Sequence, residues 1–319
     1  VVSSMKIFDH LALVTSQNTD ELKTFIQDAP HKYKVYTIPK RTYGVRTIAQ
    51  PTAELKQIQK ITVDYLQKKL PVHPAASAYI KGKGIKHNAF QHRKNQYLLK
   101  LDFEDFFNSI TPHIFWNICE SILDFLPCNI EKTWYEKILF WCPSKKSQKL
   151  ILSIGAPSSP FISNFCMYLF DKSVYEYCIQ HQIIYTRYAD DLTFSTNKKE
   201  VLFPIPMIIK DISHDHFKGR LRLNKLKTKF SSKAHNRHVT GVTITNDNKI
   251  SIGRDKKRYI KSLVYRYKIK QLSMQELSLL KGLLAFSNDI EPLFITTLEN
   301  KYSVDVIASI FKVNHEKIK

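Results

Sequence analysis

Four residues constrain this chain most: Tyr188, Ala189, Asp190 and Asp191 lie between two apolar runs rich in β-branched and aromatic side chains. Such runs on both sides of a short polar pair predict a β-hairpin with the two carboxylates at its turn. Neighbouring carboxylates repel each other unless a cation neutralises them, and their hard oxygen atoms suit Mg²⁺. An ordinary solvated acidic turn is the alternative, and so short a pattern often arises by chance. The rest of the chain has to decide between these two interpretations.

The charge of the chain points to its partners. Its 319 residues include 49 basic and 28 acidic side chains, which gives a net charge of +21. This imbalance predicts a polyanionic partner, with nucleic acid as the first candidate and an anionic membrane surface as the second. The chain has no run of 18 apolar residues, so we expect no membrane-spanning helix. The hydrophobic content of 43% is sufficient for a core and more than one subdomain.

Other common sites are missing from the sequence. There is no HExxH spacing, no Walker lysine loop and no GxGxxG pattern. The five cysteines are scattered without a CxxC pair, which favours buried thiols in a reducing compartment such as the cytoplasm. The N-terminal residues also lack the pattern of a signal peptide. Residues 81–84 read Lys-Gly-Lys-Gly, a turn that can approach a phosphate backbone.

Periodicity and capping signals predict an α+β protein. Ser159 is expected as the N-cap of a long helix with Pro160 at its first position, Ser273 and Glu276 as a capping box, and Ser303 as the start of the last helix. From Arg254 onward the pattern is helical and basic. The other expected elements are helices over 20–27, 52–69, 111–124, 131–141, 159–181 and 205–215, and strands over 34–39, 44–49, 97–103, 239–245 and 250–252.

Asp102 supplies a third carboxylate. It ends a strongly apolar run, residues 97–101, that is typical of a central strand, where an unpaired carboxylate is unfavourable. A strand ending in Asp102 and a hairpin presenting Asp190 and Asp191 would together build a site of three carboxylates on one sheet. Two-metal nucleotidyl transfer needs such a site, because two Mg²⁺ ions then hold the attacking and leaving oxygens.

Five segments now resemble the reverse transcriptases in order and context. They are residues 46–51, 101–109, 155–160, 188–191 and 223–228, and the similarity spans roughly residues 33–245. One such motif is weak evidence, whereas five in order are strong. The resemblance implies a right-hand polymerase. We expect N-terminal helices and fingers in residues 1–95, a palm with an antiparallel sheet and inserted finger helices in 96–250, and a helical basic thumb in 251–319.

Two further motifs narrow the resemblance to the bacterial retron reverse transcriptases. Asn88, Ala89 and His92 fit an NAxxH pattern, and Val239, Thr240 and Gly241 fit a VTG pattern. Taken alone, the first could be a polar pair at a helix start and the second a strand edge. Together with the palm motifs they favour a retron enzyme.

The resemblance implies a role for individual residues around the carboxylates. Asp102, Asp190 and Asp191 match the metal-binding triad, in which Asp102 and Asp190 are the firmer direct ligands, and the Phe103 carbonyl is a minor ligand. Lys227 matches a lysine that protonates the leaving pyrophosphate, although a solvated basic face would explain it equally well.

The incoming dNTP is expected to meet a second group of residues. Phe107 matches the aromatic steric gate that excludes a 2′-hydroxyl, with an ordinary core phenylalanine as the alternative. Arg46 with Lys40 or Arg41 matches the finger cations that hold the triphosphate. Gly155 and Pro157 match the backbone and packing positions of the nucleotide pocket. Ile154 departs from the family, which usually carries Gln there, so we expect no side-chain contact from that position.

The resemblance implies that both signature motifs and the basic thumb helix contact the RNA. The expected contacts are Asn88, His92, Val239, Thr240, Gly241, Arg254, Lys257, Arg258, Lys261 and Arg266. The implied enzyme binds its own non-coding RNA, uses a guanosine 2′-hydroxyl as primer, and copies part of that RNA into branched RNA–DNA. A host RNase H would remove the copied RNA, and an effector protein would join the enzyme in phage defence.

Three alternatives remain open. A group II intron-type reverse transcriptase would carry a maturase extension, which we do not expect here. An RNA-dependent RNA polymerase would not favour an aromatic side chain at Phe107. A catalytically silent RNA-binding scaffold would gain nothing from carboxylates next to a polyanion unless a metal were bound.

Overall fold

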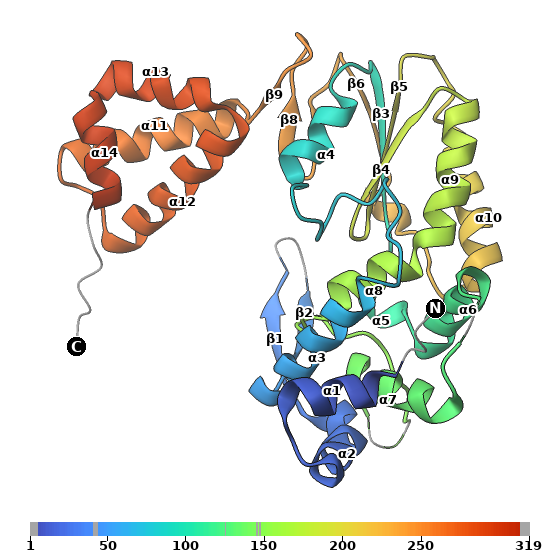
Figure 1. Cartoon of the computed structure of the whole chain (residues 1–319). Helices are drawn as coiled ribbons and strands as arrows, with labels where there is room; N and C mark the ends of the chain where they lie inside the picture. Colours follow the sequence, from blue (N-terminus) through green and yellow to red (C-terminus); the bar gives the residue numbers. More distant parts are fainter. Residues whose placement is uncertain (1–5, 41–43, 125, 145, 147, 313–319) are drawn as a thin grey trace.

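The computed structural model describes residues 6–40, 44–124, 126–144, 146 and 148–312. Figure 1 shows three parts: helices and a two-stranded ribbon around the N-terminal third, a central sheet with helices beside it, and a group of C-terminal helices standing to one side. The strands of all three sheets are antiparallel. The predicted α+β class is therefore confirmed.

A long ribbon is the main feature of the N-terminal part. Its strands β1 (Tyr33–Pro39) and β2 (Val45–Pro51) pair from Tyr33 opposite Pro51 to Pro39 opposite Val45, close to the two strands predicted over 34–39 and 44–49. The helix α1 (Ile7–Thr15) was not predicted, because its burial depends on packing against α3 and α7 rather than on a local signal. The flanking helices are α2 (Thr19–Asp28), the 3₁₀ turn η1 (Ala29–His31), α3 (Ala53–Leu66), α5 (Phe106–Ser109), α6 (Pro112–Ile122) and α7 (Asn129–Leu139).

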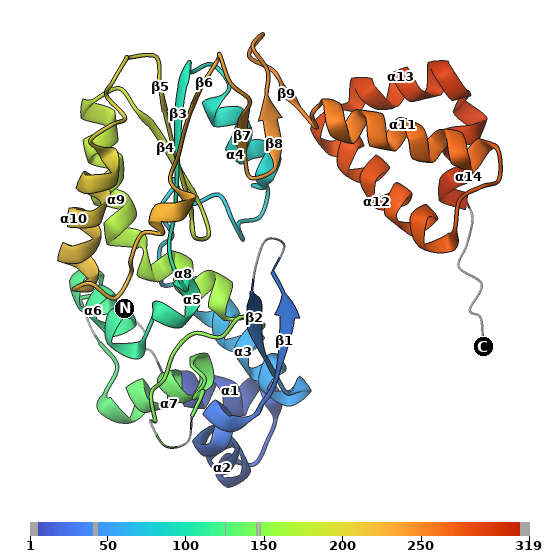
Figure 2. The same cartoon turned by 180° about the vertical axis from the view of Figure 1, so that it is seen from behind.

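The central sheet positions the predicted carboxylates. Its strand order is β4-β5-β3-β6, with β3 in the interior. Helices α9 and α10 lie on one side of the sheet and α4 on the other (Figures 1 and 2). The elements are β3 (Tyr97–Asp102), β4 (Ile184–Tyr188), β5 (Asp191–Thr196), β6 (Lys229–Ser232), α4 (Ile85–His92), α9 (Tyr168–Gln180) and α10 (Ile205–Phe217).

Two predicted elements are wrong in detail. The helix expected over residues 159–181 is broken at Met167 into α8 (Ser159–Cys166) and α9, and its N-cap is Ser158, which makes no side-chain capping bond. The strand expected over residues 239–245 is instead a hairpin of β7 (Arg237–Val239) and β8 (Val242–Ile244). The chain reverses there because Thr240 and Gly241 have φ angles of 46° and 81°.

The C-terminal part is helical and begins after β9 (Ile250–Ser251). The predicted capping box is confirmed: the Ser273 hydroxyl accepts from the Glu276 N–H, and the Glu276 carboxylate accepts from the Ser273 N–H. Ser303 likewise accepts from the Val306 N–H at the start of the last helix. The helices are α11 (Arg254–Lys268), α12 (Met274–Ile290), α13 (Pro292–Tyr302), which was not predicted, and α14 (Val304–Lys312).

Two large hydrophobic cores hold the chain together. The first joins the N-terminal helices to β3, β4, β5, α8, α9 and α10. The second contains Ala89 of α4 and Leu98 of β3, the strands β7 and β8, and the four C-terminal helices. The predicted boundary at residue 250 therefore lies within one continuous core.

The remaining general predictions concern cysteines and membranes. All five cysteines are free; Cys128 is exposed and the other four are buried, so the expectation of buried thiols fails for Cys128 alone. Among the residues described, no helix combines the length and the apolar character needed to cross a bilayer.

Candidate active site

Asp102, Asp190 and Asp191 converge at one end of the central sheet. Asp102 ends β3 and pairs with Asp191 at the start of β5, while Asp190 lies in the turn between β4 and β5. One carboxylate oxygen from each residue lies within 4.8 Å of the others. The backbone fixes this arrangement, because the Phe103 N–H donates to the Asp190 carbonyl at 3.1 Å and the Asn224 N–H donates to the Asp102 carbonyl at 2.7 Å.

The hairpin turn that carries Asp190 holds a strained residue. Tyr188 pairs with Asp191, so Ala189 and Asp190 are the two turn residues. Ala189 has a φ of 58°, a left-handed conformation that costs roughly 1–2 kcal/mol for a residue with a Cβ. Its carbonyl accepts a hydrogen bond from Arg187 Nη1 at 3.1 Å, which offsets part of that strain.

The electrostatics of the three carboxylates favour an added positive charge. Burial, and then the charge of Asp102, raises the pKa of Asp190. Burial, and then the charge of Asp190, raises the pKa of Asp191 to about 7. Three hard carboxylates at this spacing fit divalent cations, which would relieve their mutual repulsion.

Lys227 faces the same cluster. Its Nζ lies 2.7 Å from Asp102 Oδ1 in an ion pair. Burial lowers the pKa of Lys227, but the hydrogen bond to Asp102 and the charges of the three carboxylates outweigh it, so the net pKa is raised. The lysine thus stays protonated beside the carboxylates.

Of the predicted nucleotide-binding residues, Arg46 acts on the carboxylates directly. Arg46, on β2, is exposed, and its charge acts on Asp190 to lower that carboxyl's pKa. Phe107 is half-buried, with its ring 5.3 Å from that of Phe106. Pro157 is also half-buried. Lys40 is exposed at the end of β1, and Arg41, its predicted alternative, lies outside the described residues.

At Gly155 the loop before α8 packs closely against strand β2 of the ribbon. Its φ is 127°, and a Cβ added to it would lie 3.0 Å from the Ala49 carbonyl oxygen. Next to it, the Ile154 carbonyl accepts a hydrogen bond from the Ala49 N–H at 2.9 Å. A glycine is therefore required, because both the backbone angle and the close approach exclude larger residues.

Three predicted RNA contacts are corrected by their burial. The side chains of Asn88, His92 and Val239 are each 0% exposed, so they have no surface with which to touch RNA. Asn88 and His92 face the sheet from α4, and Val239 belongs to the second core. Thr240 is half-buried and Gly241 is exposed at the turn between β7 and β8, so both residues are accessible to a binding partner.

The basic residues of α11 divide into two groups. Lys257 and Arg266 pair with Glu291 and Glu276 at 2.5 and 2.6 Å, which ties them to α12 and its C-terminal end. Lys261 is half-buried, with its Nζ 6.0 Å from the ring centre of Phe294. The exposed cations on this helix are Arg254, Arg258 and Lys268, and Arg258 pairs with Asp255 only at the surface.

Two residues of the site were not predicted from the sequence. Tyr79 has a φ of 61°, is 53% exposed and lies 6.4 Å from Phe107, ring to ring. Burial, and then the charge of Asp190, raises the pKa of Tyr79. Lys100, on β3, lowers the pKa of Asp191. No sequence pattern places Tyr79 near the carboxylates, whereas Lys100 lies two residues before Asp102 on the predicted strand and therefore on the same face of the sheet.

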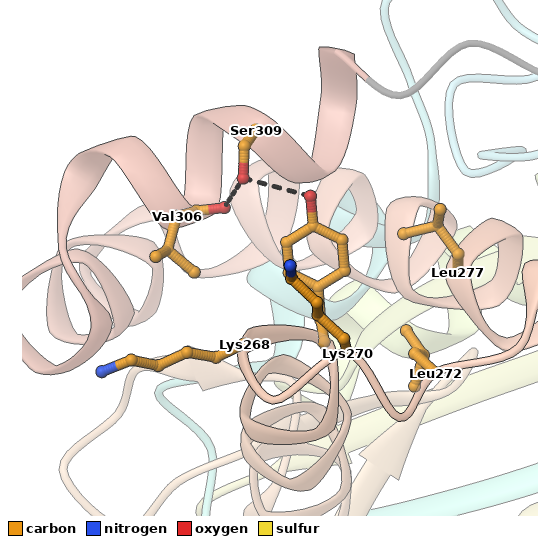
Figure 3. A pocket seen from close by; sticks show the side chains of 7 residues that line it. Lys268, Lys270, Leu272, Leu277, Val306 and Ser309 are labelled. Carbon is orange, nitrogen blue, oxygen red and sulfur yellow. Dashed lines mark hydrogen bonds between the residues drawn. The ribbon is translucent and has the colours of Figure 1, made fainter.

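A separate cavity of about 450 Å³ lies among the C-terminal helices (Figure 3). The Tyr267 hydroxyl hydrogen-bonds to the Ser309 hydroxyl across it at 3.1 Å. None of the carboxylates lines it, so it is not part of the candidate active site. Its other lining residues are Lys268, Lys270, Leu272, Leu277 and Val306.

Comparisons with a family model and with curated proteins all match reverse transcriptases. A family model described as "Reverse transcriptase (RNA-dependent DNA polymerase)" matches residues 38–244, more than half of the chain. The "Retron Ec83 reverse transcriptase" of Escherichia coli is 48% identical over 282 residues, covering 88% of this chain and 90% of the relative. The "Retron Ec73 reverse transcriptase" of the same organism is 32% identical over 311 residues, covering 92% and 95%.

Solved structures give a weaker likeness. A telomerase from Candida albicans in complex with a fragment of telomeric RNA has 11% identity and a TM-score of 0.48, covering 91% of this chain and 63% of that chain. An apo telomerase from Candida tropicalis has 12% identity and a TM-score of 0.49, covering 84% and 58%. This chain thus spans less than two thirds of either telomerase, and TM-scores below 0.5 add nothing to the fold assignment.

Proposed function

Because this chain belongs to the retron reverse transcriptases, RNA-directed DNA polymerases with a right-hand fold, we propose that it copies part of its own structured non-coding RNA into DNA. The primer is a guanosine 2′-hydroxyl of that RNA, and the product is a branched RNA–DNA molecule. The observation that carries the catalytic part of this proposal is the convergence of Asp102, Asp190 and Asp191 within 4.8 Å. In this proposal residues 1–95 contain the fingers, 96–250 the palm and 251–319 the thumb.

The carboxylates supply the metal site. Asp102, Asp190 and Asp191, with the Phe103 carbonyl, would hold two Mg²⁺ ions, whose chemistry is to lower the pKa of the attacking hydroxyl and to offset charge on the departing pyrophosphate. The raised pKa values of Asp190 and Asp191 support this role, because each carboxylate disfavours its charged form until a cation is near.

Lys227 acts on the leaving group. Its raised pKa keeps Nζ protonated near neutral pH, and its contact with Asp102 holds it at the carboxylates. From there it donates a proton to the pyrophosphate as the oxygen–phosphorus bond breaks. Arg46 and Lys40 bind the triphosphate from the ribbon, where a guanidinium can contact two phosphate oxygens at once.

Phe107, Gly155 and Pro157 define the dNTP pocket. Phe107 presents its ring beneath the sugar, so that a 2′-hydroxyl would clash with it. Gly155 lets the backbone approach closely, and Pro157 packs beside it. Phe107 packs against the first hydrophobic core but stays partly exposed, which supports the gate because part of the side chain is free to meet a sugar.

RNA binding is assigned to surfaces that remain accessible. These are the turn at Thr240 and Gly241 and the exposed cations Arg254 and Arg258, while Lys257, Lys261 and Arg266 add positive charge behind them. The net charge of +21 supports a salt-dependent grip on RNA and on the RNA–DNA product. A host RNase H would remove the copied RNA in the bacterial cytoplasm, and an effector protein would complete an anti-phage system.

One substitution tests the catalytic assignment. Asp190→Asn should abolish dTTP incorporation on poly(rA) primed with oligo(dT) while leaving affinity for that duplex unchanged. Asp211→Asn, an exposed aspartate on α10, is the matched control and should retain wild-type synthesis. Unchanged synthesis by Asp190→Asn would overturn the site. A wild-type protein that binds the duplex but incorporates nothing would indicate a silent scaffold.

The branched product needs its own experiment. The gene would be expressed together with the DNA that precedes it, and nucleic acid would be extracted and digested with RNase A. A DNA strand that keeps a ribonucleotide bound through its 2′-oxygen supports the proposal. A DNA product with a free 5′ end would contradict the proposed priming.

A further inference from the structure

We propose that Asn88 and His92 are positioning residues: their buried side chains hold both strands of the hairpin that carries Asp190 and Asp191, and so fix where these carboxylates lie. This inference rests on the proposed polymerase function. It gives the two signature residues a different role from the RNA contact that the sequence suggested, because both side chains are 0% exposed.

His92 bridges the two strands of the hairpin from the α4 side. Its Nε2 lies 2.7 Å from the Thr186 hydroxyl on β4, and its Nδ1 lies 2.7 Å from the Ser195 hydroxyl on β5. Asn88, one helical turn earlier, accepts a hydrogen bond from the same Thr186 hydroxyl at 2.5 Å. Thr186 stands only two residues before Tyr188, the last residue of β4. The contacts therefore act on the strands that lead directly into the turn.

With the Asn88 side-chain oxygen as the acceptor from Thr186, one neutral tautomer of His92 accounts for the hydrogen bonds of this group. Thr186 gives its single hydroxyl proton to Asn88, so it can only accept from His92, and Nε2 must carry the ring proton. Nδ1 is then an acceptor, and Ser195 donates to it. Ser195 in turn accepts from the Asn95 side-chain amide at 2.8 Å. One neutral tautomer of His92 satisfies all five side chains.

A network of this kind fixes a register. Thr186 and Ser195 are 6% and 0% exposed, so losing one partner leaves a buried polar group unsatisfied. A slip of one residue in either strand would turn its hydroxyl to the opposite face of the sheet. The network thus opposes any shift of the hairpin against α4, and such a shift would also move Asp191 away from its pairing with Asp102.

The outer side of α4 is distinct from this network. Phe90, two residues from both Asn88 and His92 on the helix, is 45% exposed, so direct RNA contact by this helix would need the face that carries Phe90. Figure 1 shows α4 beside the central sheet and β8, and the helix contacts β4 as well as β7 and β8. Inner and outer substitutions on one helix can therefore separate positioning from binding.

The test uses paired substitutions at the partner hydroxyl. Thr186→Val removes the hydroxyl at nearly constant volume, and Thr186→Ser restores it. The matched control is Thr62→Val, which removes another buried hydroxyl, one that donates to the Ile58 carbonyl within α3. Each protein is assayed with dTTP on poly(rA) primed with oligo(dT), at a series of Mg²⁺ concentrations.

We expect Thr186→Val and His92→Leu to lower kcat at least ten-fold and to raise the Mg²⁺ concentration for half-maximal rate. The KM for dTTP and the affinity for the primed duplex should stay within two-fold of wild type. Thr186→Ser should recover most of kcat, and Thr62→Val should leave kcat unchanged.

Two results would overturn the proposal: a folded Thr186→Val protein with wild-type kcat, or a loss confined to duplex affinity. If His92→Leu does not fold, the Thr186 pair and Ser195→Ala still decide the outcome. Failure of the inference is distinguishable from failure of the proposed function. If only the inference fails, the wild type synthesises DNA and the Thr186→Val and His92→Leu variants do so at the same rate. If the proposed function fails, the wild type itself synthesises no DNA.

Discussion

Arg187 and Asp171 form an ion pair closed off from solvent, with Nη2 and Oδ2 2.7 Å apart and both side chains 0% exposed. The Arg187 Nε–H also donates to the Asp171 carboxylate, and both Nη1 protons are used. Nη1 donates to the Asn164 side chain and to the Ala189 carbonyl, each at 3.1 Å. The Tyr185 hydroxyl donates to the same Asp171 carboxylate at 2.8 Å. The pair thus connects α9 to the strained residue of the carboxylate hairpin.

Arg187→Met should lower the free energy of unfolding by about 3–5 kcal/mol, because it leaves the buried Asp171 without its partner. The double variant Arg187→Met with Asp171→Leu should recover most of that loss, since no unpaired charge remains. Urea denaturation measures both. DNA synthesis should stay low in the double variant, because the bond to the Ala189 carbonyl is still missing. Recovery of synthesis along with stability would contradict a role for Arg187 in the turn.

Phe107→Ala should relax sugar selectivity, because the ring no longer occupies the space of a 2′-hydroxyl. We expect the ratio of kcat/KM for dTTP over UTP to fall by about ten-fold or more. Primer extension on poly(rA) with each nucleotide gives this ratio. Phe107→Tyr keeps the ring and should keep the selectivity. An unchanged ratio in Phe107→Ala would remove the gate assignment.

Ile154→Gln should leave the KM for dTTP unchanged or lower it. The contact that fixes this loop is the Ile154 carbonyl, which accepts from the Ala49 N–H whatever the side chain is. A glutamine adds an amide that can contact the nucleotide. Steady-state kinetics measures the change, and a large rise in KM would show that Ile154 is aligned with the wrong position of the family.

Stability should fall in acid partly because of His92. Burial lowers the pKa of His92 from 6.5 to about 3. Between these values the unfolded chain binds a proton at His92 and the folded chain does not, so the folded state loses stability as the pH drops below about 6.5. The slope from this residue approaches about 1.4 kcal/mol per pH unit.

The difference between wild type and His92→Gln isolates this contribution, since the raised pKa values of Asp190 and Asp191 act in the opposite direction in both proteins. Urea denaturation at pH 7.5 and pH 5 should show a smaller loss in His92→Gln than in wild type. Equal losses would mean that His92 becomes protonated inside the fold.

The sequence predicted the carboxylate site because its signals are local. Short, continuous apolar runs rich in β-branched and aromatic residues are typical of buried strands, so residues 97–101 and the runs beside Asp190 are recognisable as strands. Asp102 could be placed at a strand end by the same pattern. The pairing of Asp102 with Asp191 then follows once the two strands are neighbours.

The face presented by α4 could not be predicted in the same way. Asn88 and His92 are four residues apart and so share one side of a helix, but polar residues give no sign of which side is buried. Their partners Thr186 and Ser195 are about a hundred residues away in sequence. Arg187 raises the same difficulty, because a buried arginine is recognisable only when Asp171 is seen beside it. The turn at Gly241 was the missed local signal, since a glycine after a short strand favours a hairpin.

The second hydrophobic core unites residues from both sides of residue 250. Ala89 of α4 and Leu98 of β3 share it with Leu263 of α11 and Leu280 of α12. Swinging the C-terminal helices away from α4 would expose this apolar surface to water, whereas moving them together with α4 and the β7–β8 hairpin as one rigid body would not. If the C-terminal helices bind a duplex, as proposed, a duplex that displaces them would also move α4 and, through His92, the strands that carry the carboxylates. The rate of nucleotide addition would then depend on what the distant helices hold.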